Sequence, residues 1–117
     1  MDNLTFLKLW DWYHVLLTPT QREITDAYFN QDLTLSEIAE NKGISRQAVS
    51  ECLATCKKQL AEYEEKLGLA KIMQESALLK SQVGEWSATF AKQNPQAEDG
   101  ARAVEKIVNE YYSKITQ

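Results

Sequence analysis

Apolar residues recur at helical spacing along the chain, and no segment shows a convincing strand pattern. Turn and capping signals divide the chain into six segments. Gly43 and Gly68 stand where helix-terminating glycines are expected, and Pro19 and Pro95 each follow a residue that caps helices. The predicted helices cover residues 2–17, 19–30, 35–42, 45–67, 69–92 and 96–115. The sequence therefore predicts an all-α fold.

Two helix starts carry a capping box, in which a threonine is followed three residues later by glutamine or glutamate. Thr18 is paired with Gln21 in this way, and Thr34 is paired with Glu37. Asn94, which precedes a proline, has the same cap-then-proline arrangement as Thr18. We therefore expect helices to begin directly after these three capping residues.

Three of the predicted helices carry a narrow apolar seam, with residues alternately three and four positions apart, as in bundles and coiled coils. The seams consist of Val49, Leu53, Cys56, Leu60, Tyr63 and Leu67; of Leu69, Ile72, Ser76, Leu79, Val83, Trp86 and Phe90; and of Ala97, Ala101, Val104, Val108, Tyr111 and Ile115. Two interpretations remain open. Either the seams pack together within one chain, or they leave a surface for a second copy, which makes the protein a homodimer through its C-terminal helices.

Residues 35–54 have the pattern of a helix-turn-helix, in which two helices meet through a tight turn. The pattern needs apolar and small residues on the first helix, a positive-φ residue and an apolar plug in the turn, and inward apolar positions on the second helix. The residues that meet these needs are Ile38, Ala39, Gly43, Ile44, Val49, Cys52 and Leu53. Because the spacings agree with one another, the stretch predicts this motif.

The helical period fixes the opposite, outward face of the second helix. Ser45, Arg46, Gln47, Ser50 and Glu51 fall on that face, at the positions that a recognition helix presents to the major groove of DNA. Arginine pairs with guanine and glutamine with adenine, whereas glutamate accepts from cytosine or repels phosphate. For each of these residues, an ordinary solvated position is an equally good interpretation.

The net charge at first argues against nucleic acid, since 13 Lys and Arg stand against 17 Asp and Glu, giving −4. Residues 42–58, however, hold Lys42, Arg46, Lys57 and Lys58 against Glu51 alone, a local +3. The residues expected to contact phosphate are Thr34, Ser36, Lys42, Lys57 and Lys58. Such a short basic strip predicts weak, salt-sensitive binding by one copy, which a dimer would strengthen.

Several other functions have little support in the sequence. The longest uncharged apolar stretch, residues 12–17, is too short to span a membrane, and the N-terminus lacks the basic region of a signal peptide. His14 is the single histidine, and Cys52 and Cys56 lack a second pair of metal ligands, so packing roles are expected for all three. We therefore expect a cytoplasmic protein that is not an enzyme and has no cofactor or metal.

The run LTPTQREITDAYFNQDLTLSEIAENKGISRQAVSECL resembles the region 4 helix-turn-helix of sigma factors. Residues 1–67 more closely resemble the YlxM family of small bacterial helix-turn-helix proteins, with SRQAV at residues 45–49 as the most recognisable run. The resemblance implies a regulator that binds double-stranded DNA. Because the family's genes typically lie beside that of the signal recognition particle GTPase, it also implies a link to that pathway and a possible partner among the particle's components.

The chain is expected to have two parts. Residues 1–67 hold the sigma region 4-like helix-turn-helix, and residues 68–117 form a helical-bundle or coiled-coil-like extension, to which the resemblance is not applied. This extension is expected to pack on the first part as one domain, to serve dimerisation, or to do both. Sigma factors carry more Lys and Arg on the recognition helix, and 117 residues leave no room for their other regions, so a sigma-like module is expected rather than a sigma factor.

The alternative to DNA binding is an acidic helical module that binds a protein or a ribonucleoprotein. Trp10, Trp12 and Tyr13 lie close together in the first predicted helix. If these aromatic side chains are exposed, they favour an interface with another macromolecule, and if they are buried, they anchor the helix.

Overall fold

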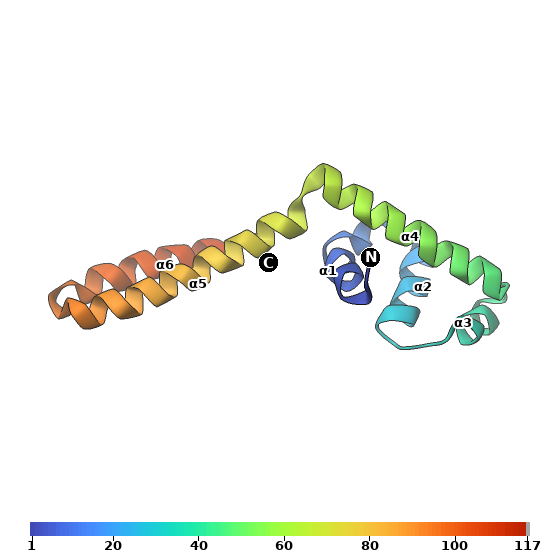
Figure 1. Ribbon diagram of the computed structural model, residues 1–117, viewed down its shortest axis with the longest axis horizontal. Helices are drawn as coiled ribbons and strands as arrows, with labels where there is room; N and C mark the ends of the chain where they lie inside the picture. The colour runs from blue at the N-terminus through green and yellow to red at the C-terminus, as the bar shows by residue number, and fades with distance from the viewer. Residues whose placement is uncertain (117) are drawn as a thin grey trace. The chain divides into compact units, whose positions relative to one another are not determined.

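Over residues 1–116, which the computed structural model describes, the chain forms six α-helices and two 3-10 turns and contains no strand (Figure 1). The elements are α1 (Asn3–Tyr13), η1 (His14–Leu16), α2 (Pro19–Phe29), α3 (Leu35–Lys42), α4 (Arg46–Leu67), α5 (Leu69–Gln93), η2 (Pro95–Ala97) and α6 (Glu98–Ile115). The predicted all-α fold is confirmed. The chain divides into an N-terminal unit, Met1–Ala70, and a C-terminal unit that begins at Lys71.

The core of the N-terminal unit forms where α1, α2 and α3 pack against α4. Phe6 of α1 is completely buried and stacks on Phe29 of α2, with 3.9 Å between the ring centroids. The core residues are Phe6, Leu9, Tyr13, Leu17, Ile24, Phe29, Ile38, Ala39, Val49, Leu53, Cys56 and Leu60. Four of them belong to the seam predicted on α4, because a 3-4 spacing keeps side chains on one face of a helix.

The seam on α4 is buried along most of its length. Val49, Cys56 and Leu60 are fully buried, whereas Leu67 at the end of the helix is exposed. Burial, together with the neighbouring Cys52, raises the pKa of the Cys56 thiol to about 12. Cys56 is therefore a protonated core side chain at neutral pH, and thiolate chemistry is suppressed there.

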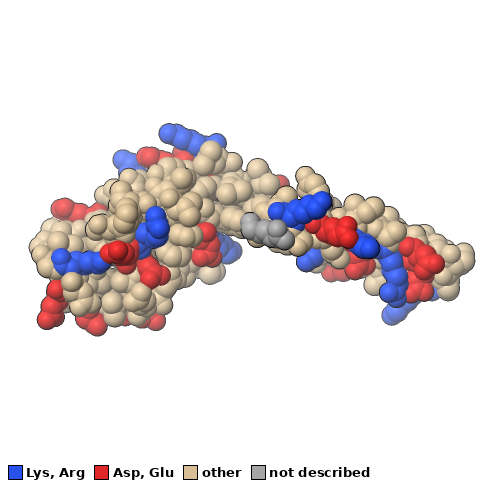
Figure 2. Space-filling view, turned by 180° about the vertical axis from the view of Figure 1, so that it is seen from behind, with Lys and Arg blue, Asp and Glu red and all other residues tan. Residues whose placement is uncertain are grey.

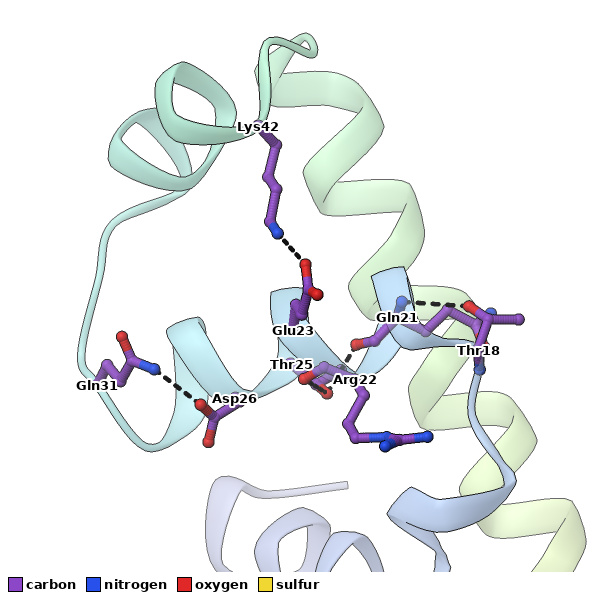
Figure 3. Close-up of polar contacts among 8 residues, drawn as sticks. All are labelled: Thr18, Gln21, Arg22, Glu23, Thr25, Asp26, Gln31 and Lys42. Carbon is purple, nitrogen blue, oxygen red and sulfur yellow. Dashed lines mark hydrogen bonds and ion pairs between the residues drawn. The ribbon is translucent and has the colours of Figure 1, made fainter.

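Most of the local signals at helix ends act as predicted. In the capping box of α2, the Gln21 N–H donates to Thr18 Oγ1 at 3.2 Å and the Thr18 N–H donates to Gln21 Oε1 at 3.1 Å (Figure 3). Gly43 and Gly68 end α3 and α4 in the left-handed conformation, at φ +66° and +62°. These positions favour glycine because a Cβ is strained there.

Two helix boundaries differ from the prediction. The expected helix over residues 2–17 ends at Tyr13 and continues as the 3-10 turn η1, which places Leu17 in the core directly before the α2 cap. Asn94 does not cap a helix, because its side-chain Nδ2 donates back to the Phe90 carbonyl at 3.3 Å. Pro95 accordingly begins the short turn η2, and α6 begins only at Glu98.

The aromatic side chains of α1 mostly anchor this helix. Tyr13 is 1% exposed, and Trp10 is half-buried with its Nε1 donating to Thr25 Oγ1 at 2.8 Å. Trp12 is the exposed member of the group. Two of the three aromatic residues thus have the packing role that was the alternative to an interface.

The Tyr13 hydroxyl lies at the end of α4, 51 residues away in sequence. It donates to Glu64 Oε1 at 2.6 Å and accepts from the Leu69 N–H at 2.9 Å, while Glu64 Oε1 also accepts from the Ala70 N–H at 3.0 Å. Burial, together with the bond to Glu64, raises the pKa of Tyr13 above its usual value of 10.0. The hydroxyl therefore stays protonated at neutral pH and holds the turn at Gly68 against α1.

We expect Tyr13→Phe to lower the free energy of unfolding of the N-terminal unit by about 1–2 kcal/mol, because both bonds of a buried hydroxyl are lost. Chemical denaturation measures this change. Tyr28→Phe removes the hydroxyl of a half-buried tyrosine on α2 and is the matched control. Equal losses in the two variants would contradict a specific role for the Tyr13 bonds.

The C-terminal unit is a hairpin in which α5 and α6 lie side by side (Figure 1), with Lys80 Nζ 4.9 Å from the centre of the Tyr112 ring. Among its described residues, only Met73, Ser87 and Ala101 are buried. The predicted seams face this interior only in part, since Ala101 belongs to the seam on α6. Seven large apolar side chains of α5 and α6 remain 40–68% exposed and form what we call the apolar face: Ile72, Leu79, Trp86, Val104, Ile107, Tyr111 and Ile115.

None of the helices in the described part of the chain is long and apolar enough to cross a lipid bilayer.

Candidate nucleic-acid interface

The turn between α3 and α4 brings the two helices of the predicted motif together. Ile38 and Ala39 on α3 are buried against α4, where Val49 and Leu53 are buried. The turn is closed by backbone hydrogen bonds, with the Ile44 N–H donating to the Ala39 carbonyl at 3.1 Å. The Ile44 side chain, expected to plug the turn, is instead 39% exposed.

The first turns of α4 present the predicted base-reading residues to solvent. Ser45 caps the helix, with Oγ accepting from the Ala48 N–H at 3.0 Å. Burial of Val49 fixes the rotation of the helix, so the residues on its other side point outward. All five predicted positions are exposed: Ser45, Arg46, Gln47, Ser50 and Glu51.

Two of these exposed residues are bonded to each other. The Gln47 Nε2 donates to Glu51 Oε1 at 3.2 Å, an i,i+4 contact on the helix surface. The Gln47 amide is thereby held beside a carboxylate. This bond uses one of the two Nε2 hydrogens, so the other hydrogen and Oε1 remain available to an adenine edge. Arg46 has no such bond to another described residue.

The cations predicted to contact phosphate differ in their surroundings. Lys42 forms an ion pair with Glu23 of α2, which crosses from the end of α3 to α2 (Figure 3). Lys57 is half-buried, and its Nζ lies 5.6 Å from the centre of the Phe29 ring. Lys58 is exposed on α4. Among the described residues, Arg46 and Lys58 are the cations of this strip without an ion pair, hydrogen bond or ring contact.

The two remaining predicted phosphate contacts lie at the start of α3. Thr34 caps this helix, with Oγ1 accepting from the Glu37 N–H at 3.1 Å, and Glu37 Oε1 accepts from the Thr34 N–H at 3.2 Å. Ser36 is exposed in the first turn. Glu37 shares this helix end, so a phosphate placed there would meet a carboxylate as well as the two hydroxyls.

The net positive charge of the basic strip, residues 42–58, is smaller than the sequence suggests. Four cations in residues 42–58 stand against Glu51 and, through space, against Glu23, which leaves +2 rather than +3. Figure 2 shows acidic and basic side chains mixed on the visible face of the N-terminal unit. The ion pair between Lys42 and Glu23 could not be predicted from a local sequence pattern, because it joins residues 19 positions apart.

The part of the chain that the structure describes contains no cluster of three or more His, Cys, Asp or Glu side chains suited to hold an ion.

Two helices joined through a left-handed glycine, with the first turns of the second helix exposed, define the N-terminal unit as a helix-turn-helix module. The model of the UPF0122 family, described as "Putative helix-turn-helix protein, YlxM / p13 like", matches residues 2–100. The chain belongs to this family, and the relatives found are bacterial.

The relatives are UPF0122 proteins. One from Clostridium novyi is 44% identical over 70 residues, which is 60% of this chain and 61% of the relative. One from Clostridium kluyveri is 51% identical over 61 residues, or 52% of this chain and 55% of the relative. The chain thus spans about 55–61% of the length of these relatives. No solved structure matches it.

Proposed function

We propose that this protein is a transcription regulator that places the first two turns of α4 in the major groove of double-stranded DNA. The observation that carries the proposal is the rotation of α4. Val49 and Leu53 are buried against α3, and this leaves Arg46, Gln47 and Ser50 exposed on the N-terminal turns. A recognition helix in a groove requires this combination of a fixed inner face and a polar outer face.

The exposed side chains suit base edges. The Arg46 guanidinium offers two parallel donors to guanine O6 and N7, and the Oε1 and second Nε2 hydrogen of Gln47 suit adenine. Glu51 accepts from a cytosine amino group. Ser45 and Ser50 complete the set. Because the Ser45 oxygen accepts the capping bond, its hydroxyl hydrogen remains free to donate to a base edge.

We propose phosphate contacts from Lys58, Lys57 and Lys42, with Thr34 and Ser36 at the start of α3. The ion pair to Glu23 and the ring contact to Phe29 weaken two of these cations. One copy therefore supplies little electrostatic affinity. We further propose a homodimer that doubles the contacts, with half-sites about 34 Å apart along the DNA.

The family resemblance alone carries the proposal that the regulation serves the signal recognition particle pathway, with a component of that particle as a partner.

We expect Arg46→Ala to weaken binding to a duplex selected from a random library by about 10-fold or more, because a bidentate base contact contributes about 1–3 kcal/mol. Helix content and melting temperature should not change, since Arg46 is exposed. Arg102→Ala is the control, because Arg102 is an exposed arginine of α6 paired with Glu98.

Fluorescence anisotropy with the selected duplex measures both variants. Unchanged affinity for Arg46→Ala would show that the groove face is misassigned. If no duplex is selected even at low salt, the acidic protein-interaction module is the better description.

A further inference from the structure

The C-terminal unit has few fully buried side chains and several exposed large apolar ones. Its interior holds one large side chain, Met73, beside the small residues Ser87 and Ala101. A two-helix hairpin with so few buried side chains does not fold stably by itself in water. The larger side chains of both helices lie instead on the apolar face defined above.

The two sides of the hairpin differ sharply in chemistry. On one side, a groove of about 330 Å³ is lined by apolar and aromatic residues of both helices, among them Leu79, Ile107, Tyr111 and Ile115. On the other side, the groove is lined by charged residues such as Glu98, Arg102, Glu105 and Lys106. The apolar face is therefore a continuous surface across α5 and α6.

Charge is absent from this face. Six of its seven side chains, all except Ile107, belong to the two predicted seams of α5 and α6. None of the thirteen seam positions is charged, in a chain that is 26% charged overall. A charged or polar ligand, including nucleic acid, has no matching group here. The face fits a partner that is itself apolar and helical.

We propose that the apolar face binds the same face of a second copy, so that α5 and α6 of two chains form a four-helix bundle. The seven side chains of the face expose on the order of 700–800 Å², which matches the roughly 800 Å² that one partner contributes to a stable interface and exceeds the largest apolar patch of most monomers. Four-helix bundles consist of two such layers of two helices and bury the apolar 3-4 seams between them.

A second copy is favoured over an unrelated protein because the apolar face must be buried whenever the chain folds. Another copy of the same chain is then always present to bury it. A two-fold interface lets one surface serve both partners, with the side chains of each copy entering the groove of the other. The C-terminal unit then folds as the dimer forms. This inference supplies the dimer that the proposed function uses, and its test needs no DNA, so the two can fail separately.

The test uses two neighbouring leucines of the full-length chain. Leu79 is 56% exposed and lines the apolar groove, whereas Leu78 is 57% exposed and lies about a quarter turn further from the interior. Leu79→Glu and Leu78→Glu therefore introduce the same charge at equal exposure, one inside the face and one outside it. Glutamate is a good helix former, so neither change opposes the helix itself.

Sedimentation equilibrium across nanomolar to micromolar concentrations gives the dissociation constant of each variant. We expect a wild-type dimer at micromolar concentration, a dissociation constant raised at least 100-fold by Leu79→Glu, and little change for Leu78→Glu. The helix content of Leu79→Glu should fall as well, because its C-terminal unit loses the partner that completes the core.

If a variant fails to fold, the oligomeric state of the wild-type chain alone tests the proposed dimer. A wild-type monomer at micromolar concentration overturns the proposal, and so does a dimer that both substitutions weaken equally.

Discussion

Phe6→Ala is expected to lower the free energy of unfolding of the N-terminal unit by about 3–5 kcal/mol. Phe6 is 0% exposed and stacks on Phe29, so its removal takes away apolar burial and leaves a cavity between α1 and α2. Because domains are stable by about 5–15 kcal/mol, this loss removes much of the total. The helix-turn-helix depends on the same core, so DNA binding should become temperature-sensitive.

Chemical denaturation of the full chain measures this change. Leu4→Ala is the matched control, since Leu4 lies on the same helix but is 65% exposed. We expect the control to lose less than about 0.5 kcal/mol. Comparable losses at the two positions would mean that α1 does not pack against the core as described.

The parts of the fold that the sequence predicts well are those encoded within a few residues. The capping boxes at Thr18 and Thr34 and the left-handed glycines at 43 and 68 depend on backbone groups no more than four residues away. Asn94 has the same kind of signal but bonds to the preceding helix instead. A capping residue in the sequence thus indicates that a capping hydrogen bond can form. Whether it forms depends on which backbone groups lie within reach of the side chain.

Contacts between distant residues could not be predicted from the sequence. The Tyr13–Glu64 bond and the Lys42–Glu23 ion pair join residues 51 and 19 positions apart, and each depends on how the helices pack. For the candidate site, the helical period correctly predicted which side chains of α4 are exposed. It could not predict that Gln47 is bonded to Glu51 or that Lys42 is partly neutralised.

The seams show a further limit of periodicity. A 3-4 pattern predicts that a face will be buried, but it does not identify the partner that buries it. On α4 the seam packs against α1, α2 and α3, whereas on α5 and α6 the same spacing produces the exposed apolar face. In the proposed dimer, the second copy buries this apolar face, just as α1, α2 and α3 bury the seam on α4.

DNA binding by the small basic strip on α4 is tested through the salt dependence of affinity. Lys57 and Lys58, neither of which has an ion pair to a described residue, are present twice in a dimer. They give about four phosphate contacts and a slope of about −3.6 in a plot of log affinity against log salt concentration. We expect an approximately 100-fold loss of affinity between about 50 and 200 mM salt. Lys58→Ala should make the slope shallower by about 1.8, since two contacts are lost.

Lys106→Ala is the control for this measurement, because Lys106 is an exposed lysine of α6 whose Nζ lies 3.9 Å from the Glu110 carboxylate. We expect the wild-type slope for this variant and a shallower one for Lys58→Ala. An absence of DNA binding at 50 mM salt, or a slope that Lys58→Ala leaves unchanged, would contradict it.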